Sequence, residues 1–160
     1  MTENKESIYI ETSVISAYFD FKKQDIERRR ITRIFFREEL AKYKAYISDV
    51  VLEELRNVPD KKQRQSFLKF IKNLPRLPLA EKTINLAESY IKKKIIPSAK
   101  LFDAYHLAIA TISGIDILVS WNYNHIANKL TEESINTFNV KNNYPQISIE
   151  FPTKLLTPKT

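Results

Sequence analysis

The stretch from residue 101 to residue 126, LFDAYHLAIATISGIDILVSWNYNHI, places the strongest constraint on the fold. Residues 101–112 are apolar around nearly the whole circumference of a helix, so they predict a helix that protein covers on all sides. Gly114 predicts the end of that helix, and residues 117–119, Ile-Leu-Val, predict a short buried strand. Polar side chains follow at once. This pattern indicates half of a parallel α/β unit, in which ligands bind beyond the carboxyl ends of the strands.

Further short apolar runs alternate with amphipathic helices, one of which we expect to extend from Asp25 to about Tyr43. Proline residues bracket the run near residue 76, as they do in edge strands. We predict a three-layer α/β/α fold with a central parallel sheet of about five strands, as one domain over residues 1–152. Residues 153–160 are expected to form a loosely held C-terminal tail. The predicted strands lie near residues 8, 45, 76, 117 and 148.

Composition excludes several classes of protein. The 160 residues contain no Cys, which excludes disulfide frameworks, thiolate zinc sites and a cysteine nucleophile. A single Gly excludes the glycine-rich loops that bind nucleotide phosphates. No stretch reaches the roughly 18 apolar residues of a membrane span, and the acidic start differs from a signal peptide. We therefore expect a soluble cytoplasmic protein, and its formal charge of +7 favours polyanionic partners such as nucleic acid.

Four oxygen-bearing side chains follow predicted strands or begin predicted helices. Glu11 ends the first strand, Asp103 lies in the first turn of the buried helix, and Asn122 follows the strand at 117–119. In the helix after residue 49, the periodicity places Glu54 about 70° from the apolar centre and Glu53 about 165° away, so Glu54 borders the core. Because parallel strands end at one edge of the sheet, the four side chains are expected to converge there.

Three carboxylates at one site would take up protons unless a hard cation lay among them. Oxygen ligands without Cys or His neighbours suit Mg²⁺ or Mn²⁺. Such ions lower the pKa of a water, orient it for in-line attack and offset the charge that develops on a phosphodiester. The sequence thus predicts Glu11, Glu54 and Asp103 as metal ligands, assisted by Asn122, in a metal-dependent nuclease.

Three segments together resemble the successive motifs of the PIN-domain family: IYIETSVISAYF, ISDVVLEEL and FDAYHLAIATISGIDILVSWNYNHI. The resemblance spans nearly the whole chain. It implies a ribonuclease that uses Mg²⁺ or Mn²⁺ and is the toxin of a VapBC-type toxin–antitoxin pair, with a cognate antitoxin and a homodimeric state. The family's four acidic or polar positions correspond to Glu11, Glu54, Asp103 and Asn122. Hydroxyl positions that support the acids correspond to Thr12, Ser13 and Ser120.

Two departures from the family pattern keep a second hypothesis open. Glu11 stands where the family usually has Asp, and Asn122 stands where it often has Asp, which removes one negative charge. A PIN-like module that binds RNA or protein without cutting is therefore the main alternative. A phosphoacceptor receiver domain is a weaker one, because the chain lacks its acidic pair before the first helix.

Other residues are weaker candidates for contact with RNA. Arg30, Arg33 and Arg37 follow one helix face, which is either a phosphate-binding stripe or a solvated face paired with glutamates. His125 could touch RNA, and Trp121 or Tyr123 could stack on a base, although such aromatics more often pack under a loop. His106 lies three residues after Asp103, but a histidine in an apolar helix is more often a hydrogen-bonded core residue than a general base.

Overall fold

A five-stranded parallel sheet forms the centre of the protein, as predicted. The structure is a computed structural model and describes residues 4–22 and 25–158. The strand order is β3-β2-β1-β4-β5, so the two-residue β3 is an edge strand, as the flanking prolines predict. The strands are β1 (Ser7–Ile10), β2 (Lys44–Ser48), β3 (Arg76–Leu77), β4 (Ile117–Val119) and β5 (Ser148–Glu150).

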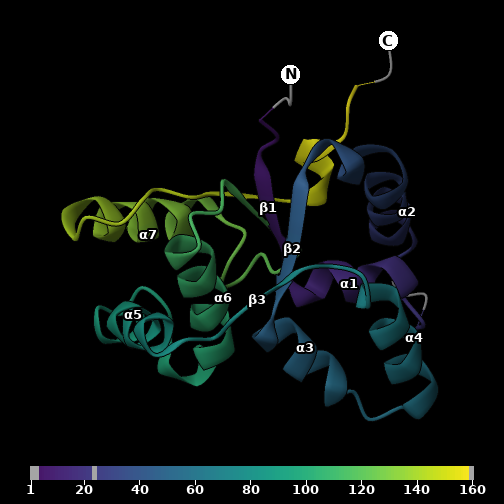
Figure 1. Cartoon of the computed structure of the whole chain (residues 1–160), viewed down its shortest axis with the longest axis horizontal. Coiled ribbons are helices and arrows are strands. Elements are labelled where there is room, and N and C mark those ends of the chain that lie inside the picture. The colour runs from purple at the N-terminus through teal and green to yellow at the C-terminus, as the bar shows by residue number, and fades with distance from the viewer. Residues whose placement is uncertain (1–3, 23–24, 159–160) are drawn as a thin grey trace.

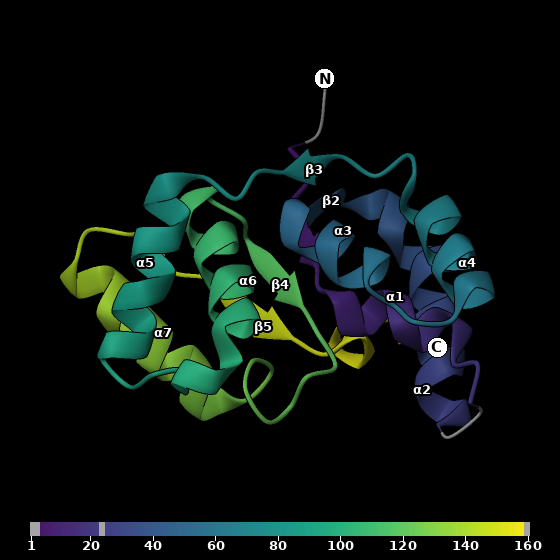
Figure 2. The same ribbon diagram turned by 90° about the horizontal axis from the view of Figure 1, so that it is seen from below.

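Helices cover both faces of the sheet and complete the predicted three-layer α/β/α arrangement. Figures 1 and 2 show α5, α6 and α7 on one side and α1, α2 and α4 on the other. The helices are α1 (Thr12–Phe19), α2 (Ile26–Ile34), α3 (Asp49–Arg56), α4 (Lys61–Ile71), α5 (Glu81–Lys92), α6 (Leu101–Ile112) and α7 (Lys129–Lys141). Among the described residues, no helix is long and apolar enough to cross a membrane.

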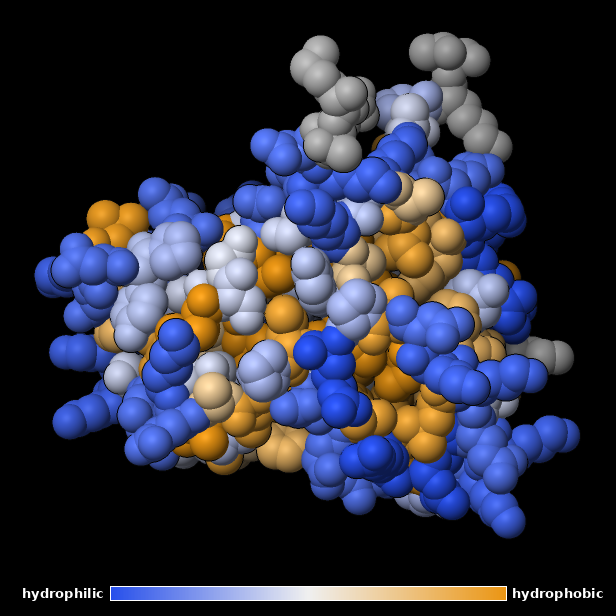
Figure 3. Space-filling model, in the orientation of Figure 1, coloured by the Kyte–Doolittle hydropathy of each residue, from blue (hydrophilic) through white to orange (hydrophobic). Residues whose placement is uncertain are grey.

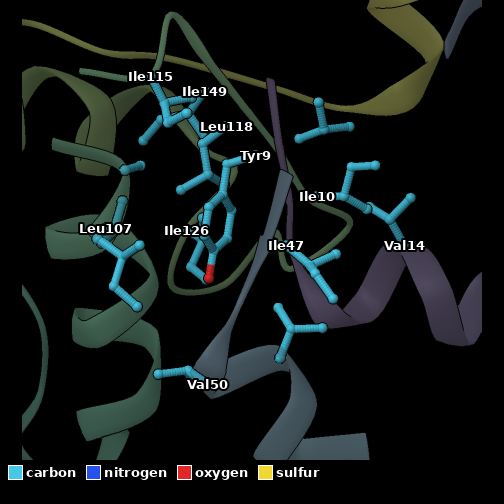
Figure 4. Packing of buried hydrophobic residues seen from close by; sticks show 14 of the residues in the cluster. Tyr9, Ile10, Val14, Ile47, Val50, Leu107, Ile115, Leu118, Ile126 and Ile149 are labelled. Atoms are coloured by element: carbon cyan, nitrogen blue, oxygen red, sulfur yellow. The ribbon is translucent and has the colours of Figure 1, made fainter. Parts of the chain in front are cut away.

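The central strand β1 is fully buried from Ile8 to Ile10 and pairs with β2 and β4. Its register against β4 matches Ile8 with Ile117 and Ile10 with Val119, so both strands end at the same level. Glu11 and Ser120, the next residue of each strand, therefore lie beside each other. Tyr9 lies between Ile8 and Ile10 in this strand and brings a phenol group into the core. Figure 4 shows the ring of Tyr9 between the sheet and α6, with its oxygen inside the core.

The predicted end of α6 at Gly114 is confirmed. Gly114 adopts φ +66°, and its N–H donates to the carbonyl oxygen of Thr111. A Cβ atom built at this position would meet no heavy atom within 4 Å. Glycine is thus favoured at this position by the left-handed backbone conformation, and not by a lack of space for a side chain.

Gly114→Ala is expected to lower the free energy of unfolding by about 1 kcal/mol, the cost of a left-handed conformation for an L-residue with a Cβ atom. Urea denaturation followed by circular dichroism measures this difference. A loss several times larger would contradict the prediction, because it would mean that the added methyl group clashes with its surroundings although the space around it is open.

One expectation was wrong. The helix after residue 25 does not continue to Tyr43 as one α-helix, because a π-helix (Phe35–Glu39) and a 3-10 helix (Leu40–Lys42) replace its second half. The wider π turn lets the Glu39 side chain lie buried, where it accepts from Lys42 and from the N–H of Thr157. That contact also holds the C-terminal segment, whose 3-10 helix η4 (Pro152–Leu155) packs against α2. Residues 159 and 160 of the predicted tail lie outside the described residues.

Candidate active site

The predicted polar residues follow β1 and β4 or belong to α1, α3 and α6. Glu11 is the most deeply placed, with 5% of its surface exposed. It is the N-cap of α1, and its Oε2 accepts from the N–H of Ser13 at 3.0 Å. The helix cap and the predicted metal ligand are thus the same side chain.

Two serine hydroxyls hold the other oxygen of Glu11. Ser13 Oγ and Ser120 Oγ donate to Glu11 Oε1 at 2.5 and 2.6 Å. Each serine oxygen in turn accepts a backbone N–H from the segment after β4, Ser13 from Trp121 and Ser120 from Asn122. Glu11 therefore joins the ends of β1 and β4 and is fixed in one orientation.

Glu54 lies one turn into α3, half-buried at the core border as predicted, whereas Glu53 is exposed. Thr12 Oγ1 donates to Glu54 Oε1 at 2.6 Å, and His106 Nε2 donates to the same oxygen at 2.6 Å. Both bonds use Oε1. Among the described residues, no hydrogen bond engages Oε2, so this oxygen is available to a ligand.

A chain of side chains behind Glu54 sets the orientation of His106, which is completely buried in α6. Its Nδ1 lies 2.5 Å from the Tyr9 hydroxyl, which lies 2.7 Å from Ser48 Oγ. Ser48 is the N-cap of α3, and its oxygen accepts the N–H groups of Val50 and Val51. With a neutral imidazole the chain has one direction, in which Ser48 donates to Tyr9, Tyr9 donates to Nδ1 and Nε2 donates to Glu54.

The surrounding charges shift several pKa values. Burial raises the pKa of Glu54, but hydrogen bonds from His106 and Thr12 and the charge of His106 outweigh it, so the pKa is lowered. Burial lowers the pKa of His106, but the hydrogen bond to Glu54 and the nearby carboxylates raise it overall. Burial raises the pKa of Asp103, and Glu11 and Glu54 raise it further. The carboxylate charges are thus only partly compensated by the protein itself.

Asp103, in the first turn of α6, opens onto a cavity of about 470 Å³ with Glu54 and Asn122. Asn122 Nδ2 donates to Asp103 Oδ1 at 3.2 Å, so the predicted assisting residue contacts the third acid directly. Glu11 does not belong to the lining of this cavity among the described residues and lies behind Glu54. The remaining lining residues are Ala99, Lys100, Leu101, Phe102, Asn124 and His125.

The donor atoms fit a hard divalent cation in type. Glu11, Glu54 and His106 bring ligand atoms within 4.8 Å of one another, and Asp103 is outside this group in the described part of the chain. His106 Nε2 already donates to Glu54 and lies 3.9 Å from Glu11 Oε2, so it orients the carboxylates and is poorly placed as a ligand. The carboxylates of Glu11, Glu54 and Asp103 remain as the oxygen donors that Mg²⁺ and Mn²⁺ prefer.

The residues suggested for RNA contact lie in different places. Arg30 pairs with Glu27, Arg37 pairs with Glu38, and Arg33 donates to the carbonyl oxygen of Tyr18. Arg33 and Arg37 line an apolar groove of about 450 Å³, which includes Tyr18, Phe36, Leu40, Phe70 and Leu74. Figure 3 shows apolar side chains reaching the surface on the side of α1 and α4.

Trp121 is part of the protein's own packing. Its Nε1 donates to Thr32 Oγ1 at 2.9 Å, its ring stacks on Phe151, and the guanidinium of Arg28 lies 5.0 Å from its centroid. His125 lines the acidic cavity, beside Asn122.

Sequence reasoning missed the role of His106 and of the residues behind it. A tyrosine inside an otherwise aliphatic buried strand, and a histidine one turn after Asp103, were the available signals. Neither indicated that Tyr9 would contact His106, because 97 residues separate them in the chain.

Fold and site together define a class of protein: a parallel α/β/α domain with a carboxylate cluster at the carboxyl edge of its sheet. A family model for the PIN domain matches residues 8–127, which include most of β1, all of β2 to β4 and every predicted acid. The chain belongs to the PIN domain family. A comparison with curated proteins finds no matching sequence.

Solved structures of VapC and related complexes share the fold at low sequence identity. VapC20 of Mycobacterium tuberculosis, described as a toxin that cleaves the sarcin-ricin loop, aligns with a TM-score of 0.59 at 14% identity over 74% of this chain and 92% of that one. FitAcB of Neisseria gonorrhoeae aligns with a TM-score of 0.58 at 14% identity, over 91% of this chain and 97% of that one. A toxin–antitoxin complex from Klebsiella pneumoniae aligns with a TM-score of 0.56 at 16% identity, over 78% of this chain and 94% of that one. These likenesses establish a VapC-like fold.

Proposed function

We propose that this protein is a divalent-metal-dependent ribonuclease that hydrolyses RNA phosphodiester bonds and acts as the toxin of a type II toxin–antitoxin pair. One observation carries the proposal: Glu54, Asp103 and Asn122 line one open cavity, with Glu11 fixed directly behind Glu54. Membership of the PIN domain family, whose members are generally nucleases, supports the same activity.

In this proposal Glu11, Glu54 and Asp103 hold Mg²⁺ or Mn²⁺. When bound, the ion lowers the pKa of a water and offsets negative charge on the phosphodiester. The chain's own residues supply the orientation. Thr12 and His106 hold Glu54 through one oxygen and present the other to the cavity, and the amide of Asn122 fixes Asp103. Hydrolysis forms one bond from water oxygen to phosphorus and breaks one ester bond, and the basic protein attracts the polyanionic substrate.

An antitoxin is the proposed protein partner, and the homodimer remains a prediction. Structural relatives described as VapBC2 of Rickettsia felis bound to a promoter DNA fragment, and as a toxin–antitoxin complex, support a partner of that kind. Co-purification with the product of a neighbouring gene tests this part of the proposal.

A binding module without cleavage is the second candidate, and the surroundings of Glu11 favour it. Oε1 of Glu11 accepts two hydroxyls and Oε2 accepts a backbone N–H, which leaves little capacity for a metal. Asn122 also brings no charge. These features predict weak metal affinity if the alternative is correct.

Incubation of purified protein with a mixed single-stranded RNA in Mn²⁺, in Mg²⁺ and in EDTA separates the two candidates. We expect cleavage in one or both metal ions and none in EDTA. Absence of cleavage in every condition, together with no Mn²⁺ binding by calorimetry, would overturn the nuclease and favour the binding module.

A further inference from the structure

A second cavity, of about 720 Å³, adjoins the acidic one. Asn124 and His125 line both cavities, and the connection between α5 and α6 contributes Pro97 to one and Ala99 to the other. The two cavities are therefore parts of one groove between this connection and the segment after β4. A volume of this size is in the range of pockets that hold small organic ligands. The other residues that line the second cavity are Lys94, Ile95, Tyr123, Asn128, Lys129, Leu130, Thr131 and Ser134.

Large apolar side chains are exposed along this groove. Leu101 and Phe102 are 36% and 41% exposed and line the acidic cavity. Tyr123 and Leu130 are 64% and 75% exposed and line the second. Such side chains gathered around a groove, rather than scattered singly, indicate a surface that a ligand covers.

The ring of Tyr123 has an aromatic neighbour on one side. The ring is nearly parallel to that of Phe151, with centroids 6.3 Å apart and planes inclined by 14°. Phe151 stacks in turn on Trp121, which Arg28 covers. Asn128 Nδ2 also donates to the backbone oxygen of Tyr123 at 2.7 Å. The ring thus contacts Phe151, the backbone of Tyr123 is held by Asn128, and most of the residue's surface faces solvent.

The two cavities differ in charge. The acidic one contains Glu54 and Asp103, whereas the second contains Lys94 and Lys129 and, in the part of the chain that the structure describes, no carboxylate. Lys129 Nζ lies 3.3 Å from Glu132, which partly neutralises it. Lys94 is the exposed cation better placed to contact a phosphate. A flat aromatic ring beside a cation and amide groups matches an unpaired nucleobase with its phosphate.

We propose that the second cavity is a nucleotide subsite, in which the unpaired base next to the cleaved phosphodiester stacks on Tyr123 while Lys94 contacts a phosphate. The subsite rests on the proposed ribonuclease function and adds to it a contact for the base next to the cleaved phosphodiester. Pairing in a duplex would prevent a base from reaching Tyr123, so the subsite selects against double-stranded substrate.

Binding of a fluorescein-labelled single-stranded RNA of ten nucleotides tests the subsite by fluorescence anisotropy. Asp103→Asn protein is the parent, so that cleavage does not consume the probe. Adding Tyr123→Ala should weaken binding about tenfold, the loss expected for one stacked base, and Tyr123→Phe should recover most of the affinity. Lys94→Gln should lower the slope of the logarithm of affinity against the logarithm of salt concentration by about 1, the value for one phosphate contact. Lys93→Gln, which lies outside the cavity, should lower this slope less.

Affinity unchanged by Tyr123→Ala would overturn the subsite. Light-induced cross-linking of RNA that contains 4-thiouridine gives a second readout on the parent protein: attachment to a peptide with Tyr123 is expected, and attachment only to the α2 peptide would overturn it. The two proposals fail separately. RNA binding that depends on Tyr123 without cleavage by the unaltered protein would remove the nuclease alone, and metal-dependent cleavage unaffected by Tyr123→Ala would remove the subsite alone.

Discussion

Asp103→Asn is expected to reduce RNA cleavage by at least about a hundredfold, more than the loss usual for residues that only support a metal ligand. The substitution keeps the size of the side chain and an oxygen that can accept from Asn122, but it removes a negative charge at the open end of the cluster. Initial rates of cleavage in saturating Mn²⁺ measure the effect, and calorimetry should show weaker Mn²⁺ binding.

The same substitution is expected to increase the stability of the metal-free protein. Burial and the charges of Glu11 and Glu54 raise the pKa of Asp103, so the folded state disfavours its ionised form. For a raised pKa, stability is greatest while the group is protonated and falls as the pH rises through that pKa. A neutral Asn removes this penalty at neutral pH. Higher stability with lost cleavage would show that the carboxylate serves function at the expense of the fold.

Glu53→Gln is the matched control, because it removes one negative charge from an exposed position beside Glu54. Its cleavage rate should stay within about twofold of the unaltered protein, as expected for a surface substitution of about ±0.5 kcal/mol. Cleavage by Asp103→Asn at the unaltered rate would remove Asp103 from the site. An equal loss in both variants would instead point to general electrostatic attraction of Mn²⁺ by acidic side chains rather than to a metal contact of Asp103.

His106→Ala should weaken Mn²⁺ binding and cleavage by about 10- to 100-fold, the range for residues that orient metal ligands. His106 Nε2 donates to Glu54 Oε1, and without it Thr12 is the one remaining donor to that carboxylate among the described residues. The substitution also removes the hydrogen-bond partner that Nδ1 gives the Tyr9 hydroxyl, and it opens a cavity in the core. Urea denaturation in EDTA should therefore show a loss of roughly 2–4 kcal/mol.

His106→Gln separates the orienting role from simple packing. Its amide N–H can reach the position of Nε2 and donate to Glu54, so Mn²⁺ affinity should recover more than stability does. If His106→Ala binds Mn²⁺ as tightly as the unaltered protein, His106 has only a core role. If His106→Gln is as weak as His106→Ala while both remain folded, a direct metal–imidazole contact becomes the better explanation.

The sequence predicts the fold well because its strands are short apolar runs and each lies between amphipathic helices. Burial of Glu54 and exposure of Glu53 follow from helical periodicity alone, and the structure confirms both. The extent of the helix after Asp25 could not be predicted in this way. Its π turn accompanies a contact of Glu39 with Thr157, which lies 118 positions further along the chain.

The candidate site was predicted less completely than the fold. Strand ends and helix starts identify which acids share one edge, since topology places them there. Hydrogen bonds from Ser13 and Ser120 to Glu11, and the line from Ser48 through Tyr9 to His106, depend on side-chain orientation in three dimensions. Residue type and spacing carry little information about such contacts.

The line of hydrogen bonds from Ser48 to Glu54 has a consequence for heat inactivation. It begins at the N-cap of α3 and ends on a glutamate of the same helix, after passing through β1 and α6. Fraying of the first turn of α3 would therefore disturb Glu54 even while the rest of the sheet persists. A nuclease built in this way would stop cutting before it unfolds, so a damaged or incompletely folded copy would be harmless to the RNA around it.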